Sequence, residues 1–298
     1  MKALQQILIS NEGLDGIDRA CQKATLIEHF TGAELNVQQV IWDSLADEPF
    51  DEAAKCQLIK SISKAEHKDL ESIVARFRDK VASLNTETIW AKDTVATTIE
   101  QIEKLGIELL IKPYDEHGLI DYISAPMDWR TVRNAPCATL ISKSNDWQTG
   151  GNILVAVDAT DPDHAELNSE LLRWAELLRH VLNAELHIVC TYPDLGQNLN
   201  QRQVAFDYLG LKESMATSKQ TALDELLAQE QIVARTHVVE GKPAKAISEL
   251  ATELAATVTL IGTHGRSGIG KLILGNTAEA ILPKLPGDVL AVKPPQTS

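Results

Sequence analysis

Short apolar runs alternate with longer amphipathic stretches along the whole chain. The short runs are rich in Ile, Leu and Val, which is typical of buried strands, whereas the longer stretches repeat apolar residues at helical spacing. In the first half this pattern predicts strands at 6–11, 35–42, 87–91, 109–111 and 137–142, and helices at 17–30, 51–84, 94–105 and 127–134. Strands that alternate with helices indicate βαβ units built around a parallel sheet.

The same plan restarts after a polar segment, 142–152, which contains Gly150 and Gly151 and is typical of a linker. The second half predicts strands at 153–158, 186–192, 236–240, 258–261 and 289–293, and helices at 202–230, 244–255 and 276–285. A repeat of this length indicates domain duplication, because solenoid repeats are only ~20–50 residues long. We therefore expect an α/β fold with two tandem five-stranded parallel-sheet domains, helices on both faces, at residues 1–145 and 151–298.

Composition narrows the range of partners. The net charge is −14, and no basic stripe with interleaved aromatic residues is present, so we expect no nucleic-acid partner. No apolar run reaches the ~18 residues of a membrane span, which favours a cytoplasmic protein. The four cysteines are far apart in the sequence, and we interpret them as free thiols in a reducing compartment.

Candidate binding residues follow three predicted strands of the second domain. Asp158 is expected to end the first strand, the segment 241–243 (Gly-Lys-Pro) follows the third, and a glycine-rich stretch, 262–275, follows the fourth. Ligands of open parallel sheets bind beyond the carboxyl ends of the strands, where the strand order reverses. A carboxylate opposite a glycine cradle suits a nucleotide, because backbone N–H groups can approach its phosphates there.

Each of these residues also has an interpretation that needs no ligand. Asp158 could cap the next helix or turn, and Asn276 with Glu279 has the spacing of a capping box. His264 stands between two glycines and could contact a phosphate, but an exposed loop histidine is the simpler interpretation.

The sequence gives little support for a catalytic or metal-binding motif. Asp161, Asp163 and His164 are residue types that bind metals, but we interpret them as the start of a helix and predict no metal site. Leu272 stands where a P-loop needs Ser or Thr, and Ile269 replaces the last glycine of a nucleophile elbow. With no convincing nucleophile–base pair, we expect no enzyme activity.

The glycine stretch resembles a known family signature. Gly262-x-x-Gly265, nine residues, then Gly275-Asn276 is similar to the Gly-2x-Gly-9x-Gly-(Ser/Thr) motif of the universal stress protein family, and the resemblance covers the chain as two tandem copies. It implies five-stranded parallel sheets of the adenine-nucleotide alpha-hydrolase-like kind, with the two domains pairing through their last strands. Single-domain members form the corresponding dimer, and a homodimer of this chain stays an alternative.

The resemblance also implies site residues and a cofactor. Nucleotide-binding members hold ATP at this loop, so Asp158 would meet the adenosine, and Gly262, Gly265 and Gly275 would let the backbone reach the phosphates. Asn276 replaces the family's hydroxyl, for which the adjacent Thr277 could substitute.

The first domain departs from the motif. Pro113, Glu116 and Ala125-Pro126 stand near its glycine positions, and Asn11 replaces the strand-end aspartate. Proline removes a backbone donor and a carboxylate repels phosphate, so we expect no nucleotide at this loop of the first domain.

Three functions remain open from the sequence. The first is a non-enzymatic stress-response protein whose second domain binds ATP or a related nucleotide. The second is an interaction module that has lost its ligand, or a carrier of a small apolar or lipid-like molecule beneath the long helices 51–84 and 202–230. The third, a weak hydrolase, has the least support.

Overall fold

The computed structural model of the chain describes residues 4–114, 126–143, 145–194, 208–263 and 284–294. The chain divides into two compact units, Met1–Asp146 and Trp147–Ser298. Each unit is an α/β body with a parallel sheet.

The N-terminal unit contains, in chain order, β1 (Gln6–Asn11), α1 (Ile17–Thr31), β2 (Glu34–Ile41), η1 (Ser44–Asp47), α2 (Glu52–Arg78), β3 (Leu84–Trp90), α3 (Thr94–Leu105), β4 (Leu109–Pro113), α4 (Pro126–Asn134) and β5 (Ala138–Ser142). Its strands run in the order β3-β2-β1-β4-β5, and neighbouring strands are parallel.

The C-terminal unit contains β6 (Asn152–Ala156), η3 (Pro162–His164), α5 (Ala165–Leu182), β7 (Glu185–Tyr192), α7 (Tyr208–Glu230), β8 (Arg235–Glu240), α8 (Pro243–Glu253), β9 (Ala256–Gly262) and β10 (Asp288–Val292). Its strands run in the order β8-β7-β6-β9-β10, again parallel. Both units therefore have the same strand order, as duplication predicts.

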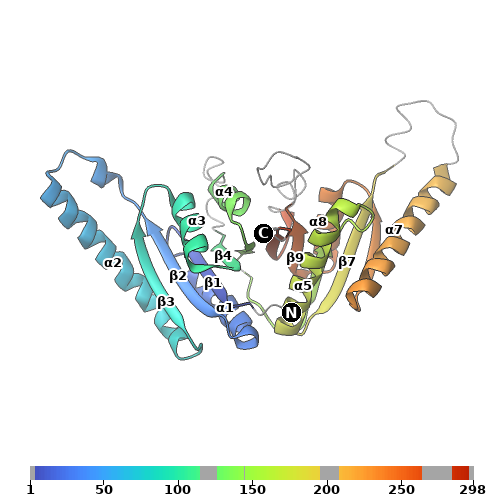
Figure 1. Cartoon of the computed structure of the whole chain (residues 1–298), viewed down its shortest axis with the longest axis horizontal. Helices are drawn as coiled ribbons and strands as arrows, with labels where there is room; N and C mark the ends of the chain where they lie inside the picture. Colours follow the sequence, from blue (N-terminus) through green and yellow to red (C-terminus); the bar gives the residue numbers. More distant parts are fainter. Residues whose placement is uncertain (1–3, 115–125, 144, 195–207, 264–283, 295–298) are drawn as a thin grey trace. The chain divides into compact units, whose positions relative to one another are not determined.

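Burial follows the position of each strand in its sheet. The central strands β1 and β6 carry apolar runs that are completely buried, because helices cover both faces of a parallel sheet. The edge strands β3 and β8 are only partly buried. In Figure 1, α2 lies along β3 and α7 lies along β7, each on the sheet of its own unit.

One apolar cluster shows how a helix closes a face of the N-terminal sheet. Leu8 of β1 and Leu110 of β4 pack with Ile102 of α3, and all three side chains are buried. The chain moves outward from β1 to β3 and then returns to β4 on the other side of β1. Because crossovers between parallel strands are right-handed, this reversal places α3 on the opposite face of the sheet from α1 and α2.

Local chemistry sets several helix ends. The carboxylates of Asp51 and Asp93 accept the backbone N–H groups of Ala54 and Ala96 and so cap α2 and α3. The helix α3 ends at Leu105 and is followed by its C-cap Gly106, whose φ of 63° favours glycine.

Most expected elements are present, and the largest error concerns the first long helix. It was expected at 51–84, but α2 ends at Arg78 and Leu84 opens β3, where it pairs with Leu35 of β2. The turn between them is held by Ala82, whose N–H donates to the Glu28 carboxylate of α1 (3.0 Å). A contact with a distant helix therefore overrides the helical spacing of Val81 and Leu84.

Other elements also differ from the prediction. The strand expected at 87–91 is longer, 84–90, and α5 occupies 165–182, where no helix was specified. The first strand of the second half was expected to reach Asp158 but ends at Ala156. The helix expected at 276–285 falls almost entirely outside the described residues, and Leu285 is not helical.

The helices of the described ranges include none that is both long and apolar enough to cross a membrane.

Candidate functional site

The carboxyl edge of the C-terminal sheet contains the point at which strand order reverses. The chain moves outward from β6 to β7 and β8, then returns to β9 on the other side of β6. The carboxyl ends of β6 and β9 are therefore neighbours, and this is where open parallel sheets bind ligands. Asp158 follows β6, and Gly262 ends β9.

Asp158 lies on the turn after β6, two residues beyond the strand. The backbone of Asp158 bonds to a side chain of α5 instead of a neighbouring strand. The Asp158 N–H donates to Asn168 Oδ1 (3.3 Å), and Asn168 Nδ2 donates to the Asp158 carbonyl (2.9 Å). Asn168 belongs to α5 and is buried, so α5 fixes the position of this turn. Asp161, rather than Asp158, caps the short helix η3 through the N–H of Asp163 (3.1 Å).

Lys219 of α7 is a member of the site that the sequence does not reveal. Its ammonium donates to Asp158 Oδ1 (3.0 Å) and to the hydroxyl of Thr160, which in turn donates to the same carboxylate oxygen (3.1 Å). Burial acts to raise the pKa of Asp158, but the hydrogen bond and charge of Lys219, together with Thr160, outweigh it and lower the pKa. The carboxylate is therefore ionised at neutral pH.

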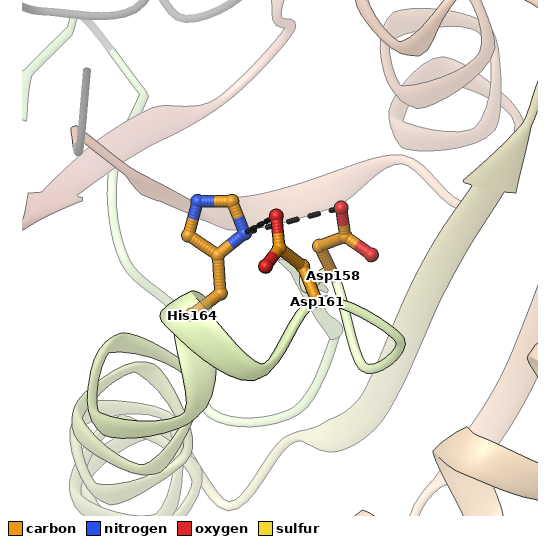
Figure 2. A group of neighbouring side chains, drawn as sticks. All are labelled: Asp158, Asp161 and His164. Carbon is orange, nitrogen blue, oxygen red and sulfur yellow. Dashed lines mark ion pairs between the residues drawn. The ribbon is translucent and has the colours of Figure 1, made fainter. Parts of the chain in front are cut away.

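The second oxygen of Asp158 faces a different group of side chains. Figure 2 shows Asp158, Asp161 and His164 pointing toward one another above the start of α5. His164 Nδ1 lies 3.9 Å from Asp158 Oδ2 and 3.5 Å from Asp161 Oδ2. The helix-start interpretation of this segment is confirmed by η3, yet the fold also gathers three potential metal ligands that the sequence did not place together.

A cleft of about 270 Å³ opens at the same edge of the sheet. It is lined by the end of β7 with the residues that follow (191–194) and by the segment 241–243, which leads from β8 into α8. The interpretation of 241–243 as part of a binding edge is consistent with this cleft. Pro243 occupies the first turn of α8, and Lys242, its N-cap, makes no side-chain capping bond.

Gly262 is described, and its surroundings explain the glycine without any ligand. A Cβ at this position would lie 2.6 Å from Leu167 Cδ2 and 3.2 Å from Leu167 Cγ. Leu167 belongs to α5 and is buried, so Gly262 lets α5 pack closely on the end of β9. Both donor groups of the neighbouring Thr263 are also used within the protein, because its N–H (2.9 Å) and its hydroxyl (3.1 Å) donate to Val292 O.

The other predicted residues of the glycine loop lie outside the described residues. They are His264, Gly265, Gly275, Asn276 and Thr277. Their assignment stays a prediction from the motif.

The N-terminal unit has a different carboxyl edge. Asn11 ends β1, and its amide nitrogen donates to Asp15 O (2.9 Å). Pro113 ends β4 and lies close to Gly16, where an added Cβ would come within 3.0 Å of Pro113 Cβ. Glu116 and Ala125 are outside the described residues.

Comparison with known proteins identifies the family. Residues 151–293 match the model of the universal stress protein family. Universal stress protein E of Escherichia coli K12 is 31% identical over 218 residues, which are 72% of this chain and 69% of that protein. The chain belongs to the universal stress protein family.

Further similarities cover between 74% and 98% of the chain. A universal stress protein E homolog of Haemophilus influenzae is 30% identical over 230 residues, 74% of each protein. The crystal structure of a functionally unknown protein from Pseudomonas aeruginosa PAO1 superposes with a TM-score of 0.73 at 27% identity, covering 98% of this chain and 93% of that one. A putative universal stress protein from Pseudomonas aeruginosa UCBPP-PA14 gives 0.70 at 26% identity, covering 98% and 94%. These similarities establish the tandem type and its α/β fold.

Proposed function

We propose that this chain is a non-enzymatic, cytoplasmic stress-response protein whose C-terminal unit binds ATP or a related nucleotide. The observation that carries the proposal is the ionised carboxylate of Asp158, held at the strand-order reversal on the same edge of the sheet as the cleft lined by 191–194 and 241–243. An ionised carboxylate only accepts hydrogen bonds, so it suits the hydroxyl groups of a ribose. Its side chain is 41% exposed, which leaves it accessible to a ligand.

The phosphates would extend toward the glycine loop after β9. This part of the proposal rests on the motif formed by Gly265, Gly275 and Asn276 and on the family resemblance. Glycines and the N–H groups at the start of a helix are well suited to bind phosphate, and the adjacent Thr277 would supply the hydroxyl that Asn276 lacks.

Isothermal titration of the full chain with ATP and Mg²⁺ tests the proposal. Wild type should release heat. Asp158→Asn should weaken binding because it removes the charged acceptor, and Gly265→Glu should abolish it by placing a carboxylate in the phosphate path. Asn11→Ala, at the corresponding place in the N-terminal unit, is the matched control and should bind like wild type. Absence of heat with the wild-type protein would reject nucleotide binding.

A second candidate function is an interaction module that has lost its nucleotide. Two contacts favour it: Lys219 already pairs with Asp158, and Leu167 accounts for Gly262 by packing alone. Native mass spectrometry of the freshly purified chain distinguishes the two functions. A co-purified nucleotide supports the first, and a ligand-free chain that gives no heat with ATP supports the second.

A further inference from the structure

We propose that Asp158, Asp161 and His164 form a binding site for a divalent transition-metal ion of the zinc type. The site shares Asp158 with the proposed nucleotide site, but all three of its ligands come from the segment between β6 and α5. Each of the three residues offers one ligand atom, and these atoms all lie within 4.8 Å of one another.

The separations fit a shared ion better than direct contact. His164 Nδ1 is 3.5 Å from Asp161 Oδ2 and 3.9 Å from Asp158 Oδ2, and both distances exceed a good N–H···O hydrogen bond of about 2.7–3.2 Å. Ligand atoms that each lie ~2.0–2.2 Å from one zinc ion in a tetrahedral arrangement are separated by roughly 3.3–3.6 Å. A small inward movement of the two carboxylates therefore completes the site.

The orientation of each side chain supports this role (Figure 2). Asp161 uses Oδ1 to cap η3, and its Oδ2 is directed at the imidazole. Asp158 accepts hydrogen bonds from Lys219 and Thr160 at Oδ1, while its Oδ2 faces His164. With the ring proton on Nε2, His164 Nδ1 presents a lone pair to both carboxylates.

The ligands are also held in place before any ion binds. Asn168 fixes the backbone of Asp158 through two hydrogen bonds, and the His164 N–H donates to Asp161 O (3.0 Å). Preorganised ligands reduce the cost of assembling a site on binding. The side chains of His164 and Asp161 are 18% and 26% exposed, so an ion can enter from solvent and keep water as its fourth ligand.

The donor set selects the class of metal. Mg²⁺ and Ca²⁺ prefer shells made entirely of oxygen, whereas one imidazole with two carboxylates suits zinc and its neighbours. Lys219 opposes binding, because its ammonium lies 3.0 Å from Asp158 and repels a cation that approaches the same carboxylate. Zinc affinity should therefore rise when this charge is removed.

The test is isothermal titration of zinc alone into the chelator-treated full chain. His164→Ala and Asp161→Asn should each weaken binding at least tenfold, since loss even of an outer-shell partner of a metal ligand costs about 10–100-fold. Lys219→Gln should bind zinc more tightly than wild type.

His180→Ala is the matched control. His180 lies in α5, and its Nε2 is 3.7 Å from Glu176 Oε2, so it reproduces a histidine–carboxylate contact outside the three-residue cluster. Its variant should bind zinc like wild type, and circular dichroism checks that all variants are folded. Equal zinc affinity in wild type and His164→Ala, or absence of zinc heat in wild type, would overturn the proposal. Because no nucleotide is present, this result is independent of the test with ATP.

Discussion

Gly262 offers a direct test of why a motif glycine is present. An alanine here would place Cβ 2.6 Å from Leu167 Cδ2, well inside van der Waals contact. Gly262 does not have the positive φ that favours glycine, so the cost of Gly262→Ala should come from this collision. Overpacking of a buried site costs about 1–3 kcal/mol, and we expect Gly262→Ala to destabilise the C-terminal unit by this amount.

A double-mutant cycle separates packing from ligand binding. Leu167 is 6% exposed, so Leu167→Ala alone should cost about 2–5 kcal/mol. In the double variant the new methyl group enters the space that leucine vacates, so the combined loss should be smaller than the sum by about 0.5–3 kcal/mol. Urea denaturation followed by circular dichroism measures all four proteins without ligand.

The control for this cycle is Gly13→Ala. An added Cβ at Gly13 meets no atom within 4 Å, so this variant should be neutral or slightly more stable. Additive losses in the cycle, or a Gly262→Ala protein as stable as wild type, would refute the packing argument. The glycine would then be explained by phosphate approach alone.

Three further measurements test other contacts. Trp147→Phe removes a 2.7 Å hydrogen bond from the indole to the buried carboxylate of Asp288. The free energy of unfolding, measured by urea denaturation, should fall by about 1.5–3 kcal/mol, and a fall below about 0.5 kcal/mol would contradict this. Burial is the largest cause that lowers the pKa of both His187 and His237, whose rings are hydrogen-bonded at 2.9 Å. The folded state therefore binds fewer protons, and stability should fall as the pH drops below the usual histidine pKa of about 6.5. The double variant His187→Asn/His237→Gln should lose most of this pH dependence, and an unchanged profile would count against the pair. Lys219→Gln should raise the pKa of Asp158, measured by carboxyl NMR titration, because burial is then opposed mainly by Thr160; no change would show that Lys219 is not the controlling partner.

The sequence was sufficient to predict the repeated α/β plan because the central strands are uninterrupted apolar runs. Such runs identify strands reliably when helices lie between them. It failed where a tertiary contact decides the local structure. The spacing of Val81 and Leu84 continues the helical pattern of α2, but the hydrogen bond from Ala82 to Glu28 and the pairing of Leu84 with Leu35 end the helix at Arg78.

Prediction of the site from the sequence was limited in the same way, by contacts that only the fold creates. Asp158 could be found from its place after a predicted strand. Its partner Lys219 could not, because it lies 61 residues away on a helix, and no local sequence pattern specifies how that helix is rotated over the sheet. Likewise, a glycine in a motif indicates phosphate binding, and the contact of Gly262 with Leu167 is visible only in the fold. Trp147 lies in a segment interpreted as a polar linker, yet it is buried against Asp288.

The two units satisfy the polar groups at this edge of the sheet in different ways. In the N-terminal unit, Lys112 of β4 is 6% exposed and lies 3.4 Å from Asn11 Oδ1 and 3.7 Å from Glu12 Oε1. This ammonium is almost completely buried, so moving it away from its oxygen partners would leave a buried charge unpaired.

In the C-terminal unit the corresponding strand position is the buried, apolar Ile261, and the cation at Asp158 comes from α7 through the flexible side chain of Lys219. A lysine side chain on a helix can change rotamer at modest cost, so a ligand can displace Lys219 from Asp158 while the fold stays intact. The N-terminal edge has less freedom, because the Lys112 side chain is only 6% exposed, against 17% for Lys219, and Pro113 packs against Gly16. We therefore expect ligand exchange at the C-terminal edge, with the strength of the Lys219–Asp158 ion pair setting the affinity.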